Sequence, residues 1–401
     1  MTDRQPAPFV APEVDRLAAP AGWYPDPFGL AAWRWFDGSS WTAFTGSGRP
    51  GSADAEDRRP RLPKWLSPPV LACGILTGLV LIVVAISSPW AVLAGLVPLV
   101  IVLPVLRWLD RVEPEPRTSK VHAVLWGACV AVVIAAIANT VVALLFGEVA
   151  AMVISAPVFE EGAKALGVVW ALRRREVDGI TDGIVYAGWV ALGFAVVEDM
   201  TYFALADVEG AMLPVFVLRA LMTPFAHPLF TFWAGLAIGR TVHHGLPIWR
   251  AWWGLGLAMI THAIWNGSLV LSEVTYDVDE DVGVAVILLA MLLFLVLFIA
   301  VAVTLFVMRR REQRRFVASV PALVLRYHVA PDEAQLFVGW RQLLRQRRRL
   351  TRRQRRSFDR LHASLARLSL LQERPGEFDT EAEQVYATQL TDAVTELRSL
   401  R

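Results

Sequence analysis

The stretch VFEEGAKALG, Val158–Gly167, places three ionisable side chains inside a run that is otherwise apolar for a full membrane crossing. Glu160 and Lys164 are four residues apart, so a helix brings them to one face in the favourable Glu-before-Lys order. Glu161 points about 100° away, so the lysine could hold one glutamate while its neighbour stays free. An ionisable group at bilayer depth costs at least a few kcal/mol, so these residues need partners on other helices or in water.

Three later apolar runs carry polar groups of the same kind. One contains Phe194 and Glu198, the next contains His227 between two prolines, and the third contains His262 and Asn266, which are four apart. At a rise of about 1.5 Å per residue, all of these groups fall within the hydrocarbon layer, near its middle or in its outer half. Four neighbouring helices that each carry a carboxylate or an imidazole indicate one polar, water-containing pocket.

Such a pocket suits hydrolysis. A glutamate can take a proton from water, and a second acid or an imidazole can orient that water or protonate the leaving amine. Amide and imidazole donors can stabilise a tetrahedral oxyanion. The set Glu198, His227 and His262 could instead hold zinc with an open position for water, although the chain has no H-E-x-x-H motif. Ser155 and Ser268 have no obvious paired base.

The same residues are also compatible with functions that involve no hydrolysis. Glu160 and Lys164 could form an internal ion pair that only orients helices, and Gly162 and Gly167 suit close helix packing in either case. The chain could then be a non-catalytic membrane scaffold or sensor. Buried carboxylates also relay protons in transporters, but the sequence has no clear internal repeat of the transporter kind.

The composition predicts which elements position these groups. The 401 residues are 55% hydrophobic and only 19% charged, and the charges crowd the two ends of the chain. This distribution predicts an all-α polytopic membrane protein with polar tails. Cys73 and Cys129 both lie in apolar runs and do not suggest a disulfide framework. The first residues lack the apolar core of a cleavable signal peptide, so insertion is expected to begin with the first span.

About eight runs reach the roughly 20 residues that a crossing needs. They cover residues 67–87, 89–107, 121–146, 147–172, 180–204, 213–239, 248–272 and 283–308, with the least distinct boundary near Gly147. Basic loops (Arg107 to Lys120, Arg173 to Arg175, Arg240 to Arg250) alternate with acidic ones. Eight spans with both termini inside place every basic loop on the cytoplasmic side of the cell membrane.

The polar ends divide further. We predict disorder in residues 1–20, a small β module rich in tryptophan in 21–46 and a linker in 47–66, before the membrane domain of 67–308. Residues 309–401 form an Arg-rich, helical, cytoplasmic tail. This tail could be a solvated helical pair, an amphipathic helix on anionic lipid or, least favoured, a nucleic-acid patch.

Four motifs in this order on successive spans resemble those of the PrsW intramembrane proteases. They are EEGAK, FAVVE, the isolated His227 and HAIWN, and the resemblance covers about residues 67–308. The PrsW family is similar to the CAAX prenyl proteases and bacteriocin-processing enzymes. The resemblance implies cleavage of membrane-anchored protein substrates, as in the first cut of a single-span anti-sigma factor.

By the same resemblance, Glu160 and Glu161 supply the base, with Lys164 completing their motif. His262 and Asn266 match an oxyanion or ligand motif. His227 matches an extra histidine of the PrsW branch, and Glu198 stands where the CAAX relatives have a histidine. The family is often labelled metalloprotease, whereas its structurally understood relatives look like metal-independent glutamate proteases, so the cofactor is either zinc or none.

A second resemblance covers the module of residues 21–46. Its GWYPDP and WT segments resemble a short tryptophan-rich domain of unknown function found at the ends of bacterial membrane proteins. Phe36 replaces the usual second tryptophan of the RWWDG segment. This resemblance implies no chemistry, and we expect a docking or spacer module.

Overall fold

The computed structural model describes residues 22–29, 33–36, 41–46, 66–326, 345, 347–373 and 380–399. The chain divides into two units, Met1–Pro63 and Lys64–Arg401, and each is described here by itself. The predicted disordered segment 1–20 lies outside the described residues, as does the predicted linker up to residue 65.

The first unit contains a small antiparallel sheet. Its strands β1 (Gly22–Pro25), β2 (Trp33–Phe36) and β3 (Trp41–Gly46) pair in the order β1-β2-β3. The rings of Tyr24 and Trp41 meet edge to face with centroids 6.0 Å apart, and Arg34 Nε donates to Asp26 at 2.7 Å. The predicted β module is therefore a three-stranded sheet in which ring contacts and an ion pair join the strands.

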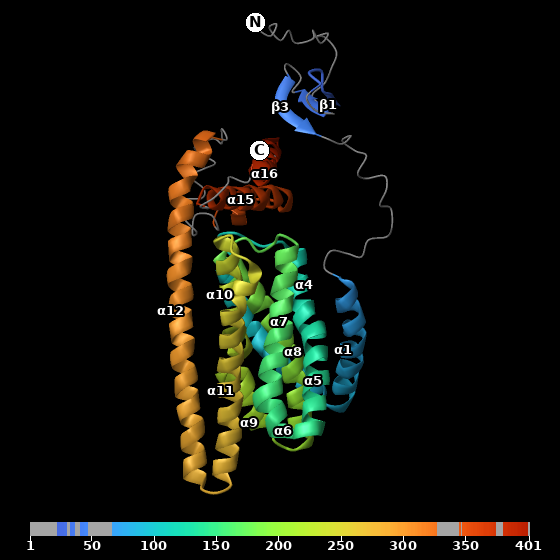
Figure 1. Cartoon of the computed structure of the whole chain (residues 1–401), viewed down its shortest axis with the longest axis vertical. Coiled ribbons are helices and arrows are strands. Elements are labelled where there is room, and N and C mark those ends of the chain that lie inside the picture. The colour runs from blue at the N-terminus through green and yellow to red at the C-terminus, as the bar shows by residue number, and fades with distance from the viewer. Residues whose placement is uncertain are drawn as a thin grey trace, which may run out of the picture. The chain divides into compact units, whose positions relative to one another are not determined.

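The second unit is helical in its described part. Its first half contains α1 (Pro68–Ser87), α2 (Pro89–Gly95), α3 (Val97–Leu109), α4 (Arg117–Leu125), η1 (Trp126–Ala131), α5 (Val132–Phe146), α6 (Glu148–Ala150), η2 (Ala151–Ser155) and α7 (Ala156–Arg173). Its second half contains α8 (Ile180–Val208), α9 (Met212–Phe216), η3 (Val217–Met222), α10 (Ala226–His243), η4 (Ile248–Ala251), α11 (Trp252–Tyr276), α12 (Glu280–Arg326), α15 (Arg352–Glu373) and α16 (Thr380–Ser399). Segments η1, η2 and η3 are π-helical. Most of these elements run side by side as one bundle (Figure 1).

Seven helices of the described residues are long and apolar enough to cross a membrane, which confirms a polytopic all-α protein. The remaining predicted span corresponds to α6, η2 and α7, which follow one another from Glu148 to Arg173 and run beside the other helices (Figure 1). This segment is not one of the seven apolar helices because it carries two glutamates and a lysine close together. Gly147, at φ +88°, separates it from α5, as the sequence predicted for this boundary.

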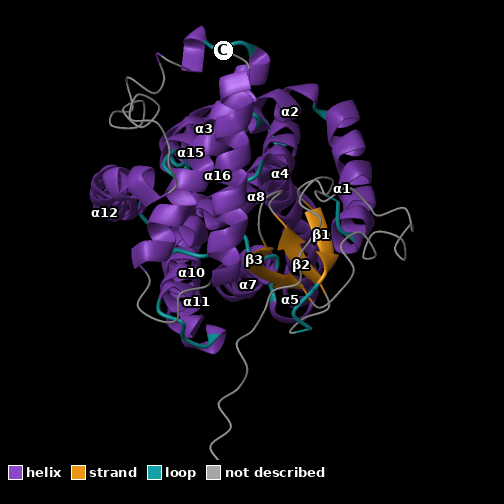
Figure 2. Cartoon of the chain, turned by 90° about the horizontal axis from the view of Figure 1, so that it is seen from above, coloured by secondary structure: helices purple, strands orange, loops and turns teal. Residues whose placement is uncertain are grey.

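Helix α8 is the central helix of the bundle. In its most apolar window 83% of the residues are buried, against 39% or less in the other six apolar spans. It packs on α2, α3, α4, α7 and α10, which surround it in the view from above (Figure 2). Glycines allow this close approach, because a Cβ at Gly183 or Gly193 would collide with the backbone of α10 or α4. The outer helices expose apolar side chains, as a bilayer requires.

The two predicted close-packing glycines of α7 differ. A Cβ at Gly167 would lie 2.6 Å from a ring carbon of Trp126, so this glycine does permit a close helix contact. A Cβ at Gly162 would meet nothing within 4 Å, so the packing role predicted for Gly162 is wrong. Only the more C-terminal of the two is needed for packing.

The described part of the C-terminal tail is helical, as predicted, and packs on the bundle. Val112, in the loop between α3 and α4, shares an apolar core with Phe316 of α12, Phe358 of α15 and Leu390 of α16. Arg309 Nε donates to the Trp108 carbonyl oxygen at 3.4 Å. The tail helices therefore lie at the end of the bundle that carries the first basic loop.

Acidic side chains of this loop are buried beneath α15. Glu113 forms an ion pair with Arg367, whose Nε lies 3.4 Å from Glu113 Oε1. The Tyr186 hydroxyl donates a hydrogen bond to Glu115 Oε2 at 3.0 Å. Burial raises the pKa of Glu115 to about 8, although Arg367 and the tyrosine hydrogen bond oppose the rise. This carboxyl group is therefore protonated in the folded protein at neutral pH.

The raised pKa of Glu115 makes the stability of the fold depend on pH. Between its ordinary pKa of 4.5 and its folded value of about 8, the folded chain binds more protons than the unfolded chain. The contribution of Glu115 to the unfolding free energy is therefore complete below about pH 4.5 and is lost as the pH rises to about 8. We expect Glu115→Gln to become more stable relative to the wild type over this window, measured by thermal unfolding in detergent. If the melting temperatures of the two proteins changed equally with pH between about 4.5 and 8, the expectation would be contradicted.

A second prediction concerns the packing of α8. Gly193→Ala forces a methyl group against the Val124 carbonyl oxygen, a backbone atom that moves only with its helix. We expect a loss of about 1–3 kcal/mol in unfolding free energy. Gly162→Ala is the matched control, because its methyl group enters open space, and it should melt at or above the wild-type temperature. Equal melting temperatures for the two variants would show that α8 does not need the close contact.

Candidate active site

The ammonium group of Lys164 lies at the centre of the polar residues that the sequence singled out. This side chain of α7 is fully buried, and its Nζ lies 3.3 Å from Glu160 Oε2, 2.9 Å from Glu161 Oε1 and 3.0 Å from His227 Nδ1. It also lies 3.8 Å from the centre of the Phe194 ring. An ammonium group has three hydrogens, so these three acceptors use all of them.

This geometry corrects one expectation from the helix spacing. Lys164 does not hold one glutamate and leave the other free, but contacts both. The reason is that residues three and four apart on a helix are both neighbours. The spacing alone could not show which of the two glutamates would be the more tightly held.

Glu161 is the more tightly held glutamate. It is completely buried, and besides Lys164 it accepts a hydrogen bond from Thr231 Oγ1 to Oε2 at 2.8 Å. Its Oε1 also lies 3.1 Å from His262 Nδ1. Both carboxylate oxygens are therefore occupied by partners from α7, α10 and α11, which fits an anchoring role.

Glu160 is held more loosely and lines a cavity. Its closest polar partners are Lys164 and the Asn139 amide, which donates to Oε1 at 3.5 Å. Asn139 is itself held by Ser155, whose hydroxyl donates to its amide oxygen at 2.8 Å. Of the two adjacent glutamates, Glu160 is the one that lines the cavity.

His227, on α10, joins the lysine to Glu198 of α8. Its Nε2 lies 2.7 Å from Glu198 Oε2, while Nδ1 faces Lys164. A protonated lysine can only donate, so Nδ1 accepts and the ring proton resides on Nε2, where it is donated to the carboxylate. Both ring nitrogens are thus engaged, and the imidazole acts as a link.

His262, on α11, presents one nitrogen to Glu160. Nδ1 pairs with Glu161, and Nε2 lies 4.0 Å from Glu160 Oε2. The ring stacks on Phe230 with centroids 4.6 Å apart, which fixes its plane. Since the carboxylate of Glu161 accepts the Nδ1 proton, Nε2 carries a lone pair on the side of Glu160.

Asn266 lines the same cavity but is not bonded to the glutamates. Its amide donates to the carbonyl oxygen of Met152 at 2.8 Å. Met152 lies in the π-helical turn η2, where the backbone pattern is interrupted. Asn266 therefore links α11 to the segment that leads into α7.

The cavity has a volume of about 780 Å³. Its polar end carries Glu160, Glu198, His227 and His262, and its wider wall is apolar. That wall includes Leu76 and Val80 of α1 and Ile137 and Leu144 of α5, which are 49–81% exposed at the outside of the bundle. The cavity therefore opens toward the apolar surface that faces lipid.

Three residues of this network escaped the sequence analysis. Arg219, on η3, forms ion pairs with both Glu198 and Asp199, with Nε 2.6 Å from Asp199 Oδ1. A charge inside an apolar span was the signal that identified the glutamates, and it could have found this arginine as well. Thr231, four residues after His227, and Asn139, an amide in an apolar run, give weaker signals.

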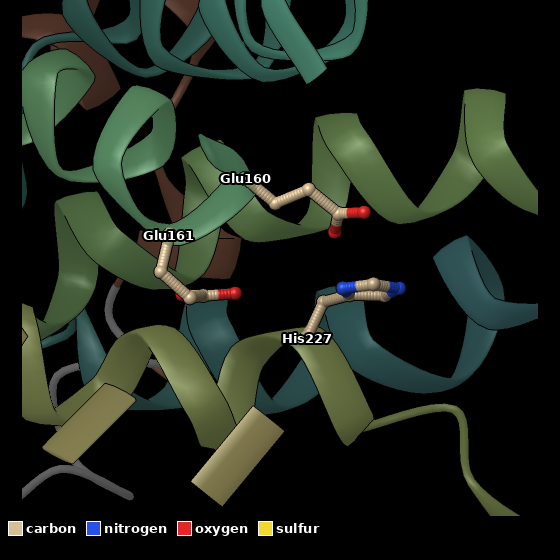
Figure 3. A group of neighbouring side chains, drawn as sticks. All are labelled: Glu160, Glu161 and His227. Atoms are coloured by element: carbon tan, nitrogen blue, oxygen red, sulfur yellow. The ribbon is translucent and has the colours of Figure 1, made fainter. Parts of the chain in front are cut away.

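Six of the seven predicted residues meet in one network, and Asn266 lines its cavity. The predicted metal set of Glu198, His227 and His262 stays a prediction, since the structure groups other donors. Ligand atoms of Glu160, Glu161 and His227 all lie within 4.8 Å of one another. Figure 3 shows the two carboxylates of α7 facing the imidazole of α10.

A metal ion does not fit this group as it is arranged. The same three side chains each place an atom within 3.3 Å of Lys164 Nζ. An ion bound through the same three atoms would lie close to the ammonium, and two neighbouring cations repel each other strongly. Lys164 would have to leave before a metal entered.

Two segments of the chain are similar to known protein families. Residues 115–302 match the model of the PrsW family intramembrane metalloprotease, and residues 21–54 match that of a protein of unknown function, DUF2510. Protease PrsW of Clostridioides difficile (strain 630) is 29% identical over 159 residues, which are 38% of this chain and 66% of that protein. Protease PrsW of Geobacillus kaustophilus (strain HTA426) is 31% identical over 150 residues, 37% of this chain and 64% of that protein. No solved structure gives a significant match.

The matched segment spans just under two thirds of each relative's length. Residues 115–302, which the family model matches, contain every residue of the network around Lys164. The four ordered motifs, their convergence in the bundle and these similarities agree. The membrane segment of residues 115–302, which carries this network, is therefore similar to the PrsW family of intramembrane metalloproteases.

Proposed function

We propose that this chain is an intramembrane endopeptidase that hydrolyses peptide bonds of membrane-anchored proteins with a water activated by Glu160. The observation that carries the proposal is the approach of Glu160 Oε2 and His262 Nε2 to 4.0 Å at the polar end of an apolar cavity. At this separation one water molecule can donate a hydrogen bond to each of them. Its lone pairs then point away, toward a substrate.

The first step is attack of this water on the scissile carbonyl carbon. Glu160 takes one proton, while the lone pair of His262 holds the other hydrogen and fixes the direction of attack. Glu161 holds His262 in the required tautomer, as carboxylates do for catalytic imidazoles. A new C–O bond forms, and the carbonyl oxygen becomes an oxyanion.

Two amides lining the cavity suit the oxyanion. The side-chain amides of Asn139 and Asn266 each have two N–H groups, and among the described residues each donates one hydrogen bond. The second N–H of either amide is available for the developing charge. When the C–N bond breaks, Glu160 returns its proton to the leaving nitrogen, so one water is consumed and an acid and an amine are released.

The position of the cavity supports a substrate that arrives within the bilayer. Its apolar wall reaches the outside of the bundle between α1 and α5, at Val80 and Ile137. A helical substrate hides its carbonyl groups in its own hydrogen bonds, so the cleaved segment has to unwind inside the cavity. The cavity volume of about 780 Å³ gives room for a short unwound segment.

The orientation that we propose has both termini in the cytoplasm. The first basic loop packs against the Arg-rich tail through Arg309 and Arg367, so these positive charges gather at one end of the bundle. Cytoplasmic loops carry such an excess of lysine and arginine. Contact of this end with anionic lipid fits the same charge.

Substitution of the glutamates tests the proposal. Glu160→Gln removes the base, and Glu161→Gln removes the anchor of Lys164 and His262, so we expect each to reduce cleavage by at least about 10²-fold. The measurement compares membrane proteomes of a deletion strain and a strain expressing each variant, and looks for single-span proteins that stay uncut in all of them. Immunoblots should show wild-type amounts of each variant in the membrane. A scaffold would tolerate both changes, so normal cleavage in the Glu160→Gln strain would exclude this mechanism.

The metal question has its own test. Because Lys164 takes the position between the three donors, we expect purified full-length chain to hold no stoichiometric zinc, and its cleavage to withstand chelators. Lys164→Gln vacates that position and should raise zinc binding, which the added change His227→Ala should abolish. Elemental analysis gives the metal content of the wild type, of these two variants and of the single variant His227→Ala. One zinc per wild-type chain, lost in His227→Ala, would instead support a metalloprotease.

A further inference from the structure

Arg219 lies in an unusual place for a charged residue. It belongs to the π-helical turn η3 within a predicted span, and its side chain is only 22% exposed. Its guanidinium pairs with Glu198 and Asp199, which are adjacent on α8, and lies 4.0 Å from the centre of the Tyr202 ring. A guanidinium is rigid, so these three contacts fix its plane.

The Glu198 oxygen that meets Arg219 is the one that accepts from His227. Glu198 Oε2 pairs with Arg219 Nη2 and lies 2.7 Å from His227 Nε2. His227 Nδ1 in turn lies 3.0 Å from Lys164 Nζ. A continuous chain of contacts thus leads from Arg219 to the ammonium that holds both α7 glutamates.

Arg219 supplies one of the positive charges that balance the buried carboxylates of this network. The connected network contains four carboxylates, on Glu160, Glu161, Glu198 and Asp199, but only two fixed cations, on Lys164 and Arg219. Without Arg219, Glu198 and Asp199 would be adjacent anions beside His227, and their negative charge would favour a ring protonated on both nitrogens. An imidazole that holds protons on both nitrogens cannot accept from Lys164.

On the basis of the proposed function, we propose that Arg219 is a positioning residue that acts through Glu198. It keeps Glu198 as an acceptor for the Nε2 proton of His227, leaves the Nδ1 lone pair to Lys164, and so holds Lys164 between Glu160 and Glu161. Arg219 itself makes no contact with either glutamate of α7 among the described hydrogen bonds and ion pairs. Its effect on hydrolysis is therefore indirect.

A spectroscopic test needs no substrate. Nitrogen-15 histidine NMR of the full chain in lipid nanodiscs reports which ring nitrogens are protonated, and the seven histidines are few enough to assign. His227→Gln identifies the resonances of His227. We expect a single form with the proton on Nε2 in the wild type, and loss of that form in Arg219→Gln. Unchanged His227 resonances in Arg219→Gln would overturn the proposal.

A kinetic test follows on a single-span protein that accumulates uncut in the Glu161→Gln strain. We expect Arg219→Gln to lower kcat by about 10²-fold with KM unchanged. Arg219→Lys keeps the positive charge but lacks the rigid guanidinium, so its kcat should lie between those of the wild type and Arg219→Gln. The kcat of the double variant Arg219→Gln, Glu198→Gln should be no lower than that of Glu198→Gln alone, because the two residues act as one unit. A change in KM alone, or additive losses in the double variant, would overturn the proposal.

Two controls separate the possible failures. Arg250→Gln removes an exposed arginine of the same unit and should leave both the spectrum and the rates unchanged. If the wild type cleaves nothing, the proposed function fails, whereas the NMR comparison still decides whether Arg219 sets the state of His227. If Arg219→Gln does not accumulate, Arg219→Lys carries the test, and a wild-type spectrum and kcat in that variant would overturn the need for the fork.

Discussion

An ammonium group with three acceptors in a water-poor interior is the constraint on which the bundle depends. Burying Lys164 is costly unless its charge and all its hydrogens are satisfied. Glu160 and Glu161 come from its own helix, but the third acceptor, His227, belongs to α10. Glu161 then reaches Thr231 and His262. Helices α7, α10 and α11 are therefore joined by polar bonds where lipid-like packing alone would leave their rotation poorly defined.

Interruptions of regular helix provide the rest of the geometry. The π-helical turn η2 precedes α7 and presents a backbone carbonyl, that of Met152, to Asn266. The turn η3 carries Arg219 to the α8 carboxylates. Such turns cost stability and persist where surrounding contacts determine them. Both flank the cavity, whereas the regular and glycine-lined α8 supplies the fixed reference between them.

Much of this could be predicted from the sequence, because membrane spans are defined by composition. The polar groups of α7, α8, α10 and α11 were evident there, whereas the break at Gly147 was the least distinct of the predicted boundaries. What could not be predicted depends on rotation about helix axes. Whether Glu160 or Glu161 faces the cavity is decided by Thr231 and His262, far away in sequence. The spacing of His262 and Asn266 placed them on one face, but could not show that Asn266 bonds a backbone carbonyl. Disorder in residues 1–20 remains a prediction, because these residues lie outside the described part of the chain.

The length of α12 has a mechanical consequence. Its 47 residues form one helix from Glu280 to Arg326, about 70 Å at 1.5 Å per residue. A bilayer core of about 30 Å accounts for less than half of this rod. The remainder carries Phe316 and Leu323 into the core formed with α15 and α16. One continuous helix thus connects that helical pair to the last span, which packs beside the helix of His262.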